Sequence, residues 1–172
     1  FPAVDGEEGL PVIKIAQMRA GATDSSQLAN TNIPDEYVVE DGDVLFSWSG
    51  SLLVRMWCGG RGALNQHLFK VTSNSYPKWM FYFWTKHHLD KFISIAESKS
   101  TTMGHIKRSD LSNSEVYLPH DDVLIEHDKV ISPLFEKLIA NNRQILTLGK
   151  LRDTLLPKLM SGEVSVHYGE DD

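Results

Sequence analysis

The last third of the chain carries a repeat of mainly apolar residues, spaced alternately three and four positions apart. Its members are Ile131, Leu134, Leu138, Asn141, Ile145, Leu148, Arg152, Leu155 and Leu159. Because an α-helix turns once in 3.6 residues, this spacing aligns them along one stripe of a helix, as in a coiled coil. A helix cannot bury such a stripe by itself. The repeat, which we call the heptad stripe, therefore predicts a long helix that packs against a second helix, in this chain or in another.

The predicted helix is long compared with the rest of the chain. A helix over residues 133–160 would span about 40 Å at a rise of about 1.5 Å per residue, more than a domain of this size covers, so we expect part of it to project. Asp121 and Asp122 are expected to cap a helix that begins near residue 122, and Pro133 either to start a new helix or to kink this one. An amphipathic helix that packs wholly on its own domain is the alternative.

Two members of the heptad stripe are polar. Asn141 at such a position weakens helix pairing but fixes its register. Arg152 needs a carboxylate, a carbonyl oxygen or water from a partner. The residues expected to pair the helices are Leu134, Leu138, Asn141, Ile145, Leu148, Leu155 and Leu159.

The remaining sequence mixes short strand patterns with one helical pattern. Apolar residues at helical spacing after Pro77 predict one amphipathic helix over residues 77–97. The predicted strands cover residues 12–15, 44–49, 52–57, 63–71 and 116–118, the predicted loops cover 20–35 and 98–105, and a short turn or helix start is predicted at 109–111. This order predicts an α+β fold: a mixed-sheet domain over residues 1–119, a long C-terminal coiled-coil helix over 120–162 and an acidic tail over 163–172.

Charge is unevenly distributed along the chain. The net charge of −6 argues against an unspecific nucleic-acid coat, but residues 47–118 carry nine Lys and Arg against four acidic residues, between two acidic flanks. A basic middle of this kind is able to form a positive face, although chance clustering of solvated charges is the alternative. The single cysteine, Cys58, and the lack of an apolar run near the ~20 residues that span a bilayer predict a cytoplasmic protein without a membrane segment.

Four pieces of the sequence, in their order along the chain, resemble the DNA-specificity subunit of type I restriction-modification enzymes. They are residues 42–50 (GDVLFSWSG), 64–71 (LNQHLFKV), 101–111 (TTMGHIKRSDL) and 151–162 (LRDTLLPKLMSG). The resemblance implies that residues 1–119 form a target recognition domain that binds DNA, and that residues 120–162 form a spacer and dimerisation helix.

The same resemblance implies a set of partners. Members of this family usually carry two such units, whose helices pack antiparallel and whose domains each read one half of a split site in double-stranded DNA. They bind two methyltransferase subunits, which hold S-adenosylmethionine, and restriction subunits in the full complex. This chain contains one unit, so a second copy of a half-subunit or the other half of a longer chain is expected to read the second half-site.

Contacts to base edges require Arg, Lys, Asn, Gln, Ser, Thr or His side chains on exposed loops. Asn65 and Gln66 offer amides suited to adenine, or alternatively satisfy loop backbone groups. Lys99, Lys107 and Arg108 suit phosphates, which position the protein without specifying sequence. His105 reads a base or caps the turn before it. The predicted DNA-binding residues are Ser47, Ser49, Arg61, Asn65, Gln66, His67, Lys99, Thr101, Thr102, His105, Lys107 and Arg108.

The sequence holds no Gly-rich phosphate loop, nucleophile elbow or methyltransferase motif. We therefore expect no catalytic, cofactor-binding or metal residue on this chain, and we expect its four tryptophans in the core. The leading prediction is a non-catalytic subunit that recognises a DNA sequence and positions methyltransferase and restriction subunits on a bipartite site. One alternative is a coiled-coil assembly or inhibitory protein that binds a partner without reading DNA. Another is an enzyme in its own right, which metal- or cofactor-dependent activity would reveal.

Overall fold

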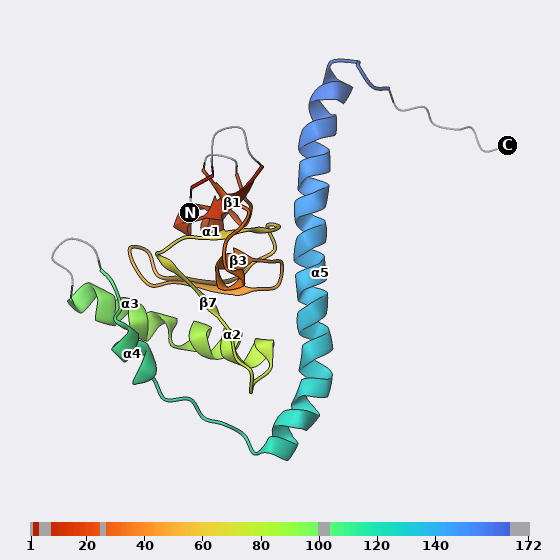
Figure 1. Cartoon of the computed structure of the whole chain (residues 1–172). Helices are drawn as coiled ribbons and strands as arrows, with labels where there is room; N and C mark the ends of the chain where they lie inside the picture. Colours follow the sequence, from red (N-terminus) through yellow and green to blue (C-terminus); the bar gives the residue numbers. More distant parts are fainter. Residues whose placement is uncertain (1, 4–7, 25–26, 100–103, 166–172) are drawn as a thin grey trace.

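The computed structural model describes residues 2–3, 8–24, 27–99 and 104–165. Two small sheets are stacked above a group of short helices, and one long helix runs along the side of both (Figure 1). The fold is α+β with a long C-terminal helix, as the sequence predicts.

The first sheet is mixed and has the strand order β2-β1-β6-β3. Its strands are β1 (Gly9–Ile13), β2 (Leu28–Asn30), β3 (Val38–Val39) and β6 (Gly62–Leu64). β1 is antiparallel to β2 and parallel to β6, and β3 is antiparallel to β6. Helix α1 (Ile15–Ala20) follows β1, and the 3-10 helix η1 (Asp35–Tyr37) precedes β3. Ile13 and Val39 of this sheet are fully buried and share a core cluster with Trp57.

The second sheet is antiparallel and carries the largest apolar side chains. Its order is β5 (Leu53–Met56), β4 (Val44–Ser47) and β7 (Leu68–Val71). β4 lies in the middle with all its residues buried, as expected for a strand covered on both faces. Phe46 lies opposite Val54 on one side and Phe69 on the other, and its ring packs against Phe92 of the helix below.

The short helices α2 (Lys78–His87), α3 (Leu89–Ser98) and α4 (Arg108–Ser112) support this second sheet. The prediction of a single helix over residues 77–97 is wrong, because the helix is interrupted at His88 and forms α2 and α3 instead. The His88 ring packs on Trp84 and its Nε2 atom lies 3.0 Å from the Glu115 carbonyl oxygen, so the side chain ties the break to the segment after α4. The short helix predicted near residues 109–111 is confirmed as α4.

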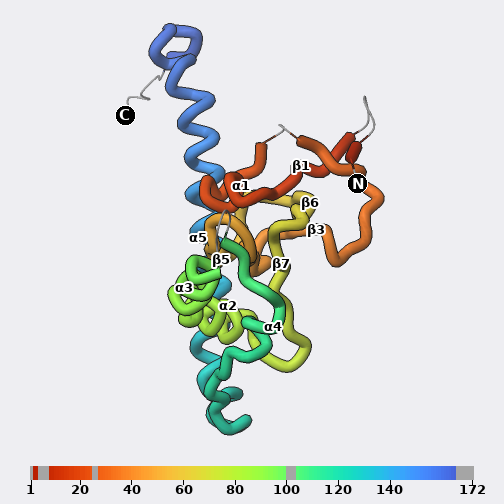
Figure 2. The backbone as a smooth tube through the Cα atoms, turned by 90° about the vertical axis from the view of Figure 1, so that its left-hand side faces the viewer, coloured from red at the N-terminus to blue at the C-terminus, as the bar shows by residue number. Residues whose placement is uncertain are grey.

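Helix α5 (Asp121–Met160) is one continuous helix of 40 residues that passes through Pro133. At about 1.5 Å per residue it is about 60 Å long. His120 is its N-cap, so Asp121 and Asp122 occupy the first turn instead of capping it. Figure 2 shows α5 passing alongside both sheets and extending beyond the first one. A projecting helix is therefore observed, and the alternative of a helix packed wholly on its own domain is wrong.

One face of α5 completes the core of the globular part. Phe135 and Ile139 are buried in a cluster with Met56 and Cys58, and Leu146 packs against the same cluster. The Trp79 indole Nε1 donates a 2.7 Å hydrogen bond to an Asp128 carboxylate oxygen. We call Phe135, Ile139, Asn142 and Leu146 the inner face of α5. Because these residues are separated by three or four positions, they form a stripe of their own beside the heptad stripe.

Several predicted strands differ from the observed ones. Residues 63–71 form two strands, β6 and β7, which belong to different sheets and are separated by a turn at Asn65. Strand β2 lies within the loop predicted over 20–35, and the predicted strand at 12–15 gives way to α1 after Ile13. The strand predicted at 116–118 is wrong: Val116 and Leu118 are in irregular chain and line an apolar cavity of about 330 Å³ with α2 and α3.

Candidate nucleic-acid interface

Three polar segments that are far apart in the sequence meet at one end of the second sheet, where strand β4 ends and strand β7 begins. They are residues 48–50 after β4, 65–67 before β7 and 104–108 before α4, and we call them together the three-loop surface. The Ile106 N–H donates to the Trp48 carbonyl (3.0 Å), and the Gly50 N–H donates to the Gly104 carbonyl (3.0 Å). The Trp48 N–H donates to the His67 carbonyl (3.2 Å). Backbone hydrogen bonds therefore fix the three segments relative to one another.

Two glycines permit this close approach. Gly50 has a φ of +66°, in the left-handed region that favours glycine. A Cβ atom at Gly104 would lie 3.1 Å from the Ala96 carbonyl oxygen of α3, so a side chain there would force the two backbones apart by a few tenths of an ångström. A substitution at either glycine is expected to disturb the backbone frame rather than a contact with a ligand.

Aromatic rings support the three-loop surface from behind. The Trp48 ring lies 5.7 Å from the His67 ring and 6.0 Å from the Phe69 ring, and the Arg108 guanidinium lies 5.7 Å from the Phe69 ring centre. Trp48 is half-buried: it packs against the core cluster around Phe46, as the sequence predicts, and its ring also contacts that of His67. Its position at the end of a buried strand, next to Ser49 and Gly50, is the sequence signal for this role.

His67 is the best-positioned candidate for a contact to a base. It is exposed, and its Nδ1 atom lies 2.8 Å from the Ser49 hydroxyl oxygen. Because this hydrogen bond occupies Nδ1 and the Trp48 ring fixes the plane, Nε2 is the ring nitrogen left to meet a ligand. An imidazole held in this way presents one polar atom in a fixed direction, which direct readout of a base edge requires.

The amides of Asn65 and Gln66 are used differently. The Asn65 Oδ1 atom accepts a hydrogen bond from the His67 N–H (3.1 Å), and its Nδ2 group donates to Gln66 Oε1 (2.9 Å). Of the two roles left open for Asn65, the structure shows the one in which it satisfies the loop. Gln66 is exposed, and its backbone carbonyl accepts the Trp48 indole N–H (3.1 Å). Asn65 therefore shapes the turn that presents Gln66 and His67.

A carboxylate organises the basic end of the surface. Both Asp110 carboxylate oxygens lie 2.7 Å from the Lys99 Nζ atom, and one also accepts the Lys107 backbone N–H (2.9 Å). The hydrogen bond from Lys99, followed by the one from Lys107, lowers the pKa of Asp110 below its usual value. Lys99 is thus already paired, whereas the side chains of Lys107 and Arg108 extend from the exposed end of the loop.

The structure separates the predicted DNA-binding residues into groups. Ser49, Asn65, Gln66, His67, His105, Lys107 and Arg108 all belong to the three-loop surface, and Lys99 adjoins it through Asp110. The prediction for Ser47 is corrected: this residue is fully buried, and its hydroxyl donates to the Ser51 carbonyl (2.6 Å) and accepts the Leu53 N–H (2.8 Å). Thr101 and Thr102 lie outside the described residues.

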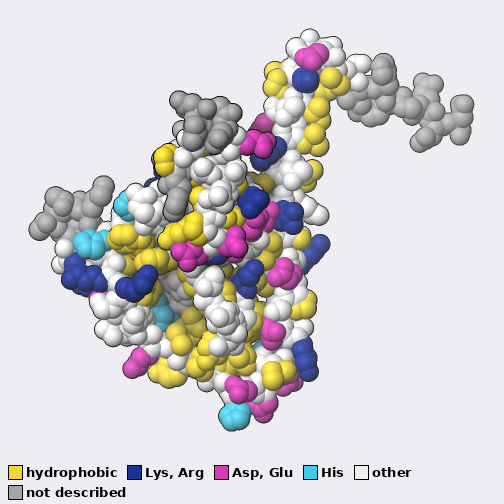
Figure 3. All heavy atoms as spheres, in the orientation of Figure 1, with side chains coloured by type: hydrophobic (Ala, Val, Ile, Leu, Met, Phe, Trp, Pro, Cys, Tyr) yellow, Lys and Arg dark blue, Asp and Glu magenta, His cyan; other side chains and the backbone are white. Residues whose placement is uncertain are grey.

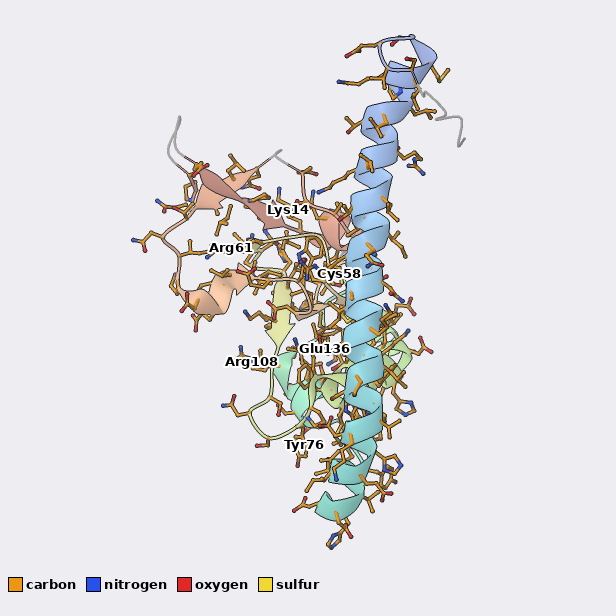
Figure 4. All side chains as sticks on the ribbon, turned by 90° about the vertical axis from the view of Figure 1, so that its right-hand side faces the viewer. Lys14, Cys58, Arg61, Tyr76, Arg108 and Glu136 are labelled. Carbon is orange, nitrogen blue, oxygen red and sulfur yellow. The ribbon has the colours of Figure 1, made fainter. Side chains whose placement is uncertain are left out.

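Arg61 lies apart from the three-loop surface, at the other end of β6 from Asn65. Its Nε atom pairs with a Glu40 carboxylate oxygen at 3.0 Å, and both side chains are more than half exposed. Figure 4 shows Arg61 and Arg108 on the same side of α5, with Arg61 closer to the first sheet and Arg108 closer to the short helices. A phosphate contact by Arg61 would therefore fall at the margin of the surface.

The electrostatic character of the three-loop surface follows from its composition. Its segments contain Lys107, Arg108 and two histidines, and they contain no acidic residue. Exposed cations beside neutral amides and hydroxyls suit a DNA backbone and the base edges beside it, because phosphate contacts position a protein while polar groups read the grooves. The composition of this surface is therefore compatible with a nucleic-acid ligand.

The residues of the heptad stripe are exposed, except for Ile131, which is half-buried. The exposed fractions are 65% for Leu134, 42% for Leu138, 66% for Ile145, 62% for Leu148, 37% for Leu155 and 40% for Leu159. Asn141 and Arg152 are also exposed, and Arg152 pairs with Asp153. Apolar side chains are visible along the projecting part of α5 in Figure 3. Exposed apolar patches of this extent usually mark an interaction site.

The profile of the type I restriction modification DNA specificity domain matches residues 5–151. The chain therefore belongs to this family. Over 172 aligned residues, 96% of the chain, it is 26% identical to the type I restriction enzyme MjaVIII specificity subunit of Methanocaldococcus jannaschii. Over 138 residues, 78% of the chain, it is 28% identical to the EcoBI specificity subunit of Escherichia coli. Over 68 residues, 40% of the chain, it is 44% identical to the MjaIX specificity subunit of Methanocaldococcus jannaschii.

These relatives are longer proteins. The chain spans 39%, 27% and 16% of their respective lengths. Membership of this family supports a role for the chain in recognising a DNA sequence. Among the described residues, no helix is both long enough and apolar enough to cross a membrane.

Proposed function

We propose that this chain is the sequence-reading part of a type I restriction-modification enzyme, and that the three-loop surface contacts double-stranded DNA. The observation that carries the proposal is the convergence of three polar segments on one braced surface. His67 is held there between Ser49 and Trp48, and Lys107 and Arg108 lie beside it. Family membership supports the same role.

The residues of this surface divide by task. Gln66 and His67 stand on the turn that Asn65 shapes, so they are placed to read base edges in a groove. Lys107 and Arg108 carry the charge that holds the phosphates, together with backbone groups of the 104–108 segment. His105 forms a backbone bridge with Ser49 and is exposed, which suits either a base or a phosphate.

We further propose that the chain does no chemistry itself and acts through partners. Methyltransferase subunits would carry S-adenosylmethionine, restriction subunits would join the full complex, and α5 would set the spacing of two readers on a bipartite site. The projecting helix with its exposed heptad stripe supports this arrangement. The cell compartment that fits this role is the cytoplasm.

A gel-shift series with methyltransferase subunits supplied tests the proposal. Randomised double-stranded DNA is selected for binding, and the selected sequence is compared with scrambled competitors at fixed salt, because phosphate contacts alone give salt-dependent affinity without preference. We expect a bipartite sequence to be enriched, and we expect His67→Ala to change the preferred bases in one half-site. Equal affinity for all sequences would overturn the proposal.

The alternative, an assembly or inhibitory protein that never touches DNA, is favoured by one observation only: the exposed apolar stripe. Partner binding that is independent of salt, without retention on DNA, would support that alternative.

A further inference from the structure

An apolar cavity lies between the second sheet, the short helices and the chain that follows α4. Its volume is about 330 Å³. Strands β4 and β7 form its roof, α2 and α3 form one wall, and α4 with residues 114–118 forms the other. Protein interiors are densely packed, so an apolar hole of this size is uncommon, and its volume lies in the range of small-molecule sites.

The walls of this cavity are uncharged and rich in aromatic rings. Phe46 and Phe69 line it from the sheet, and Trp84 and Phe92 line it from the helices. Among the described residues that line it, none is an aspartate, a glutamate, a lysine or an arginine. Such walls offer an occupant ring contacts and burial from water, but they offer no partner for a charge.

The polar groups on the walls are already engaged with the backbone. The Thr85 hydroxyl donates to a carbonyl oxygen of its own helix (2.6 Å), and the Ser114 hydroxyl donates to the Asp110 carbonyl (3.1 Å). The His88 Nε2 atom lies 3.0 Å from the Glu115 carbonyl oxygen. A charged occupant would lose its water without gaining these groups as partners, which is costly. The cavity therefore favours a neutral molecule.

Hydrogen bonds hold the wall after α4 in place, so the cavity is formed before any ligand arrives. The Ser114 N–H donates to the Leu111 carbonyl (3.0 Å), in addition to the side-chain contacts of Ser114 and His88. Irregular chain fastened in this way does not fold inward to fill the space. A preformed site does not have to be ordered when its ligand binds.

The mouth of the cavity lies where its lining residues are exposed. The exposed fractions are 38% for Tyr76, 42% for Val116 and 51% for Leu118, whereas Phe46 and Met80 are buried. Figure 4 shows Tyr76 toward the end of the molecule at which α5 begins, and Figure 3 shows hydrophobic side chains gathered over this lower part. A small molecule can thus enter from solvent beside the 114–118 segment.

We propose that this cavity binds a small neutral aromatic molecule of about two fused rings. An apolar cavity of about 150 Å³ binds benzene, so about twice that volume suits a bicyclic ring system. Aromatic rings pack favourably against one another in offset or edge-to-face arrangements, which these walls provide. Three parts of the chain surround the space and only its mouth is exposed, which fits a molecule that enters rather than a surface laid across it. The inference goes beyond the proposed reading of DNA and does not depend on it.

Two probes with the same rings and different charge test the proposal. The full chain is titrated calorimetrically with 2-naphthol, which is uncharged near neutral pH, and with 2-naphthoate, which carries a carboxylate. We expect saturable binding of 2-naphthol at a single site. We expect 2-naphthoate to bind at least about tenfold more weakly, because its carboxylate would be desolvated without a partner.

Neighbouring residues supply a matched pair of variants. Val116→Trp places a large ring at the mouth, whereas Tyr117→Trp changes a residue that is 85% exposed and does not line the cavity. Val116→Trp should remove saturable binding of 2-naphthol, and Tyr117→Trp should leave it unchanged. Thr85→Phe, which fills the cavity from the α2 side, should also remove it. Circular dichroism shows that each variant is folded. Phe69 is left unchanged, because its ring also contacts Trp48 and Arg108.

Methyl resonances of methionine locate the probe directly. Met80 lines the cavity, whereas Met18 is fully buried in the core cluster around Trp57. In a chain labelled at its methionine methyl groups, 2-naphthol should shift the Met80 resonance and leave that of Met18 in place. Assignment of the Met80 resonance comes from Met80→Leu.

Four results would each overturn the inference. They are a lack of saturable 2-naphthol binding, equal affinity for the two probes, binding that survives both Val116→Trp and Thr85→Phe, and a shift at Met18 without one at Met80. Probe affinity that falls as the chain concentration rises would show that a second copy fills the cavity, and would overturn it as well.

These outcomes are separable from those of the proposed function, because the titrations contain neither DNA nor methyltransferase subunits. A chain that selects a DNA sequence but binds no 2-naphthol would overturn the cavity site alone. A chain that binds 2-naphthol in the cavity but binds all DNA sequences equally would uphold the site and overturn the proposed reading role.

Discussion

The three-loop surface and the heptad stripe are both exposed, but they are built in opposite ways. The three-loop surface is polar, and backbone hydrogen bonds, the Trp48 ring and Asp110 brace it from behind. The heptad stripe is mainly apolar, and it lies beside the inner face through which α5 packs on the globular part. The difference indicates two kinds of recognition: fixed donors and acceptors suit small base edges, whereas a long apolar stripe gains its affinity from area.

The inner face of α5 attaches the helix that carries the heptad stripe to the globular part that carries the three-loop surface. A change there should therefore have the largest effect on stability. Phe135 is 4% exposed and contacts the rings of Tyr82 and Phe83. Phe135→Ala removes a buried ring and leaves a cavity, so we expect the free energy of unfolding to fall by about 3–5 kcal/mol. Chemical denaturation followed by circular dichroism measures this free energy. If the alanine variant does not fold, Phe135→Leu is measured in its place and should show a smaller loss.

Leu134→Ala is the matched control on the heptad stripe. Leu134 is 65% exposed, so its truncation should change the stability of one copy by less than about 0.5 kcal/mol, at a protein concentration low enough to keep copies apart. Equal losses for Phe135→Ala and Leu134→Ala would contradict the division of α5 into a covered and an uncovered face.

Lys107→Ala should weaken DNA binding by the complex with methyltransferase subunits, roughly fivefold near physiological salt, because one phosphate contact releases about one counterion. The loss should be similar for all sequences, and the slope of log affinity against log salt should fall by ~1. Lys137→Ala, an exposed lysine of α5, is the control. Equal effects from the two lysines would show that the three-loop surface is not where the phosphates lie.

Ser49→Ala should act on specificity more than on affinity. It removes the hydroxyl that holds His67 Nδ1, a hydrogen bond whose net contribution is about 1 kcal/mol. The imidazole is then free to turn, so selection from random DNA should give a less defined preference at the bases that His67 reads. Ser94→Ala, on the exposed face of α3, should leave the preference unchanged. An unchanged preference for Ser49→Ala as well would remove His67 from the reading role.

The smallest effect concerns pH. The hydrogen bond from Ser132, followed by that from Trp79, lowers the pKa of Asp128. An acid whose pKa is lower in the folded state stabilises the fold above its unfolded pKa of about 4 and loses this contribution as the pH falls through the folded pKa. The stability difference between the natural chain and Asp128→Asn should therefore be largest near neutral pH and shrink below pH of about 4. A constant difference would contradict a role for the carboxylate charge.

The sequence predicts the elements that are set by local periodicity. The long helix, the central strand β4 and the short helix α4 all follow from spacing, β-branching or turn residues within one segment. Strands β2 and β3 have three and two residues and exist only because a neighbour pairs with them. Such pairing depends on tertiary contacts, which the order of residues does not display.

For the candidate site, the sequence likewise indicates which segments take part but not which way each side chain points. Side-chain chemistry singles out three segments that the structure brings together, but chemistry alone does not distinguish an outward serine from an inward one. Ser47 closes a buried turn, whereas Ser49, two positions further on, meets His67. The bracing role of Trp48 was missed because a tryptophan at a strand end is usually core, and only the geometry shows which ring it supports.

Photocross-linking in the assembled complex tests the central claim most directly. A photoreactive phenylalanine analogue is placed at Gln66 on the three-loop surface or at Glu136 on the exposed part of α5, with methyltransferase subunits and the selected DNA present. The account predicts cross-links to DNA from position 66 and none from position 136. Cross-links from position 136 with none from position 66 would show that the DNA lies against α5 and that the three-loop surface does not read it.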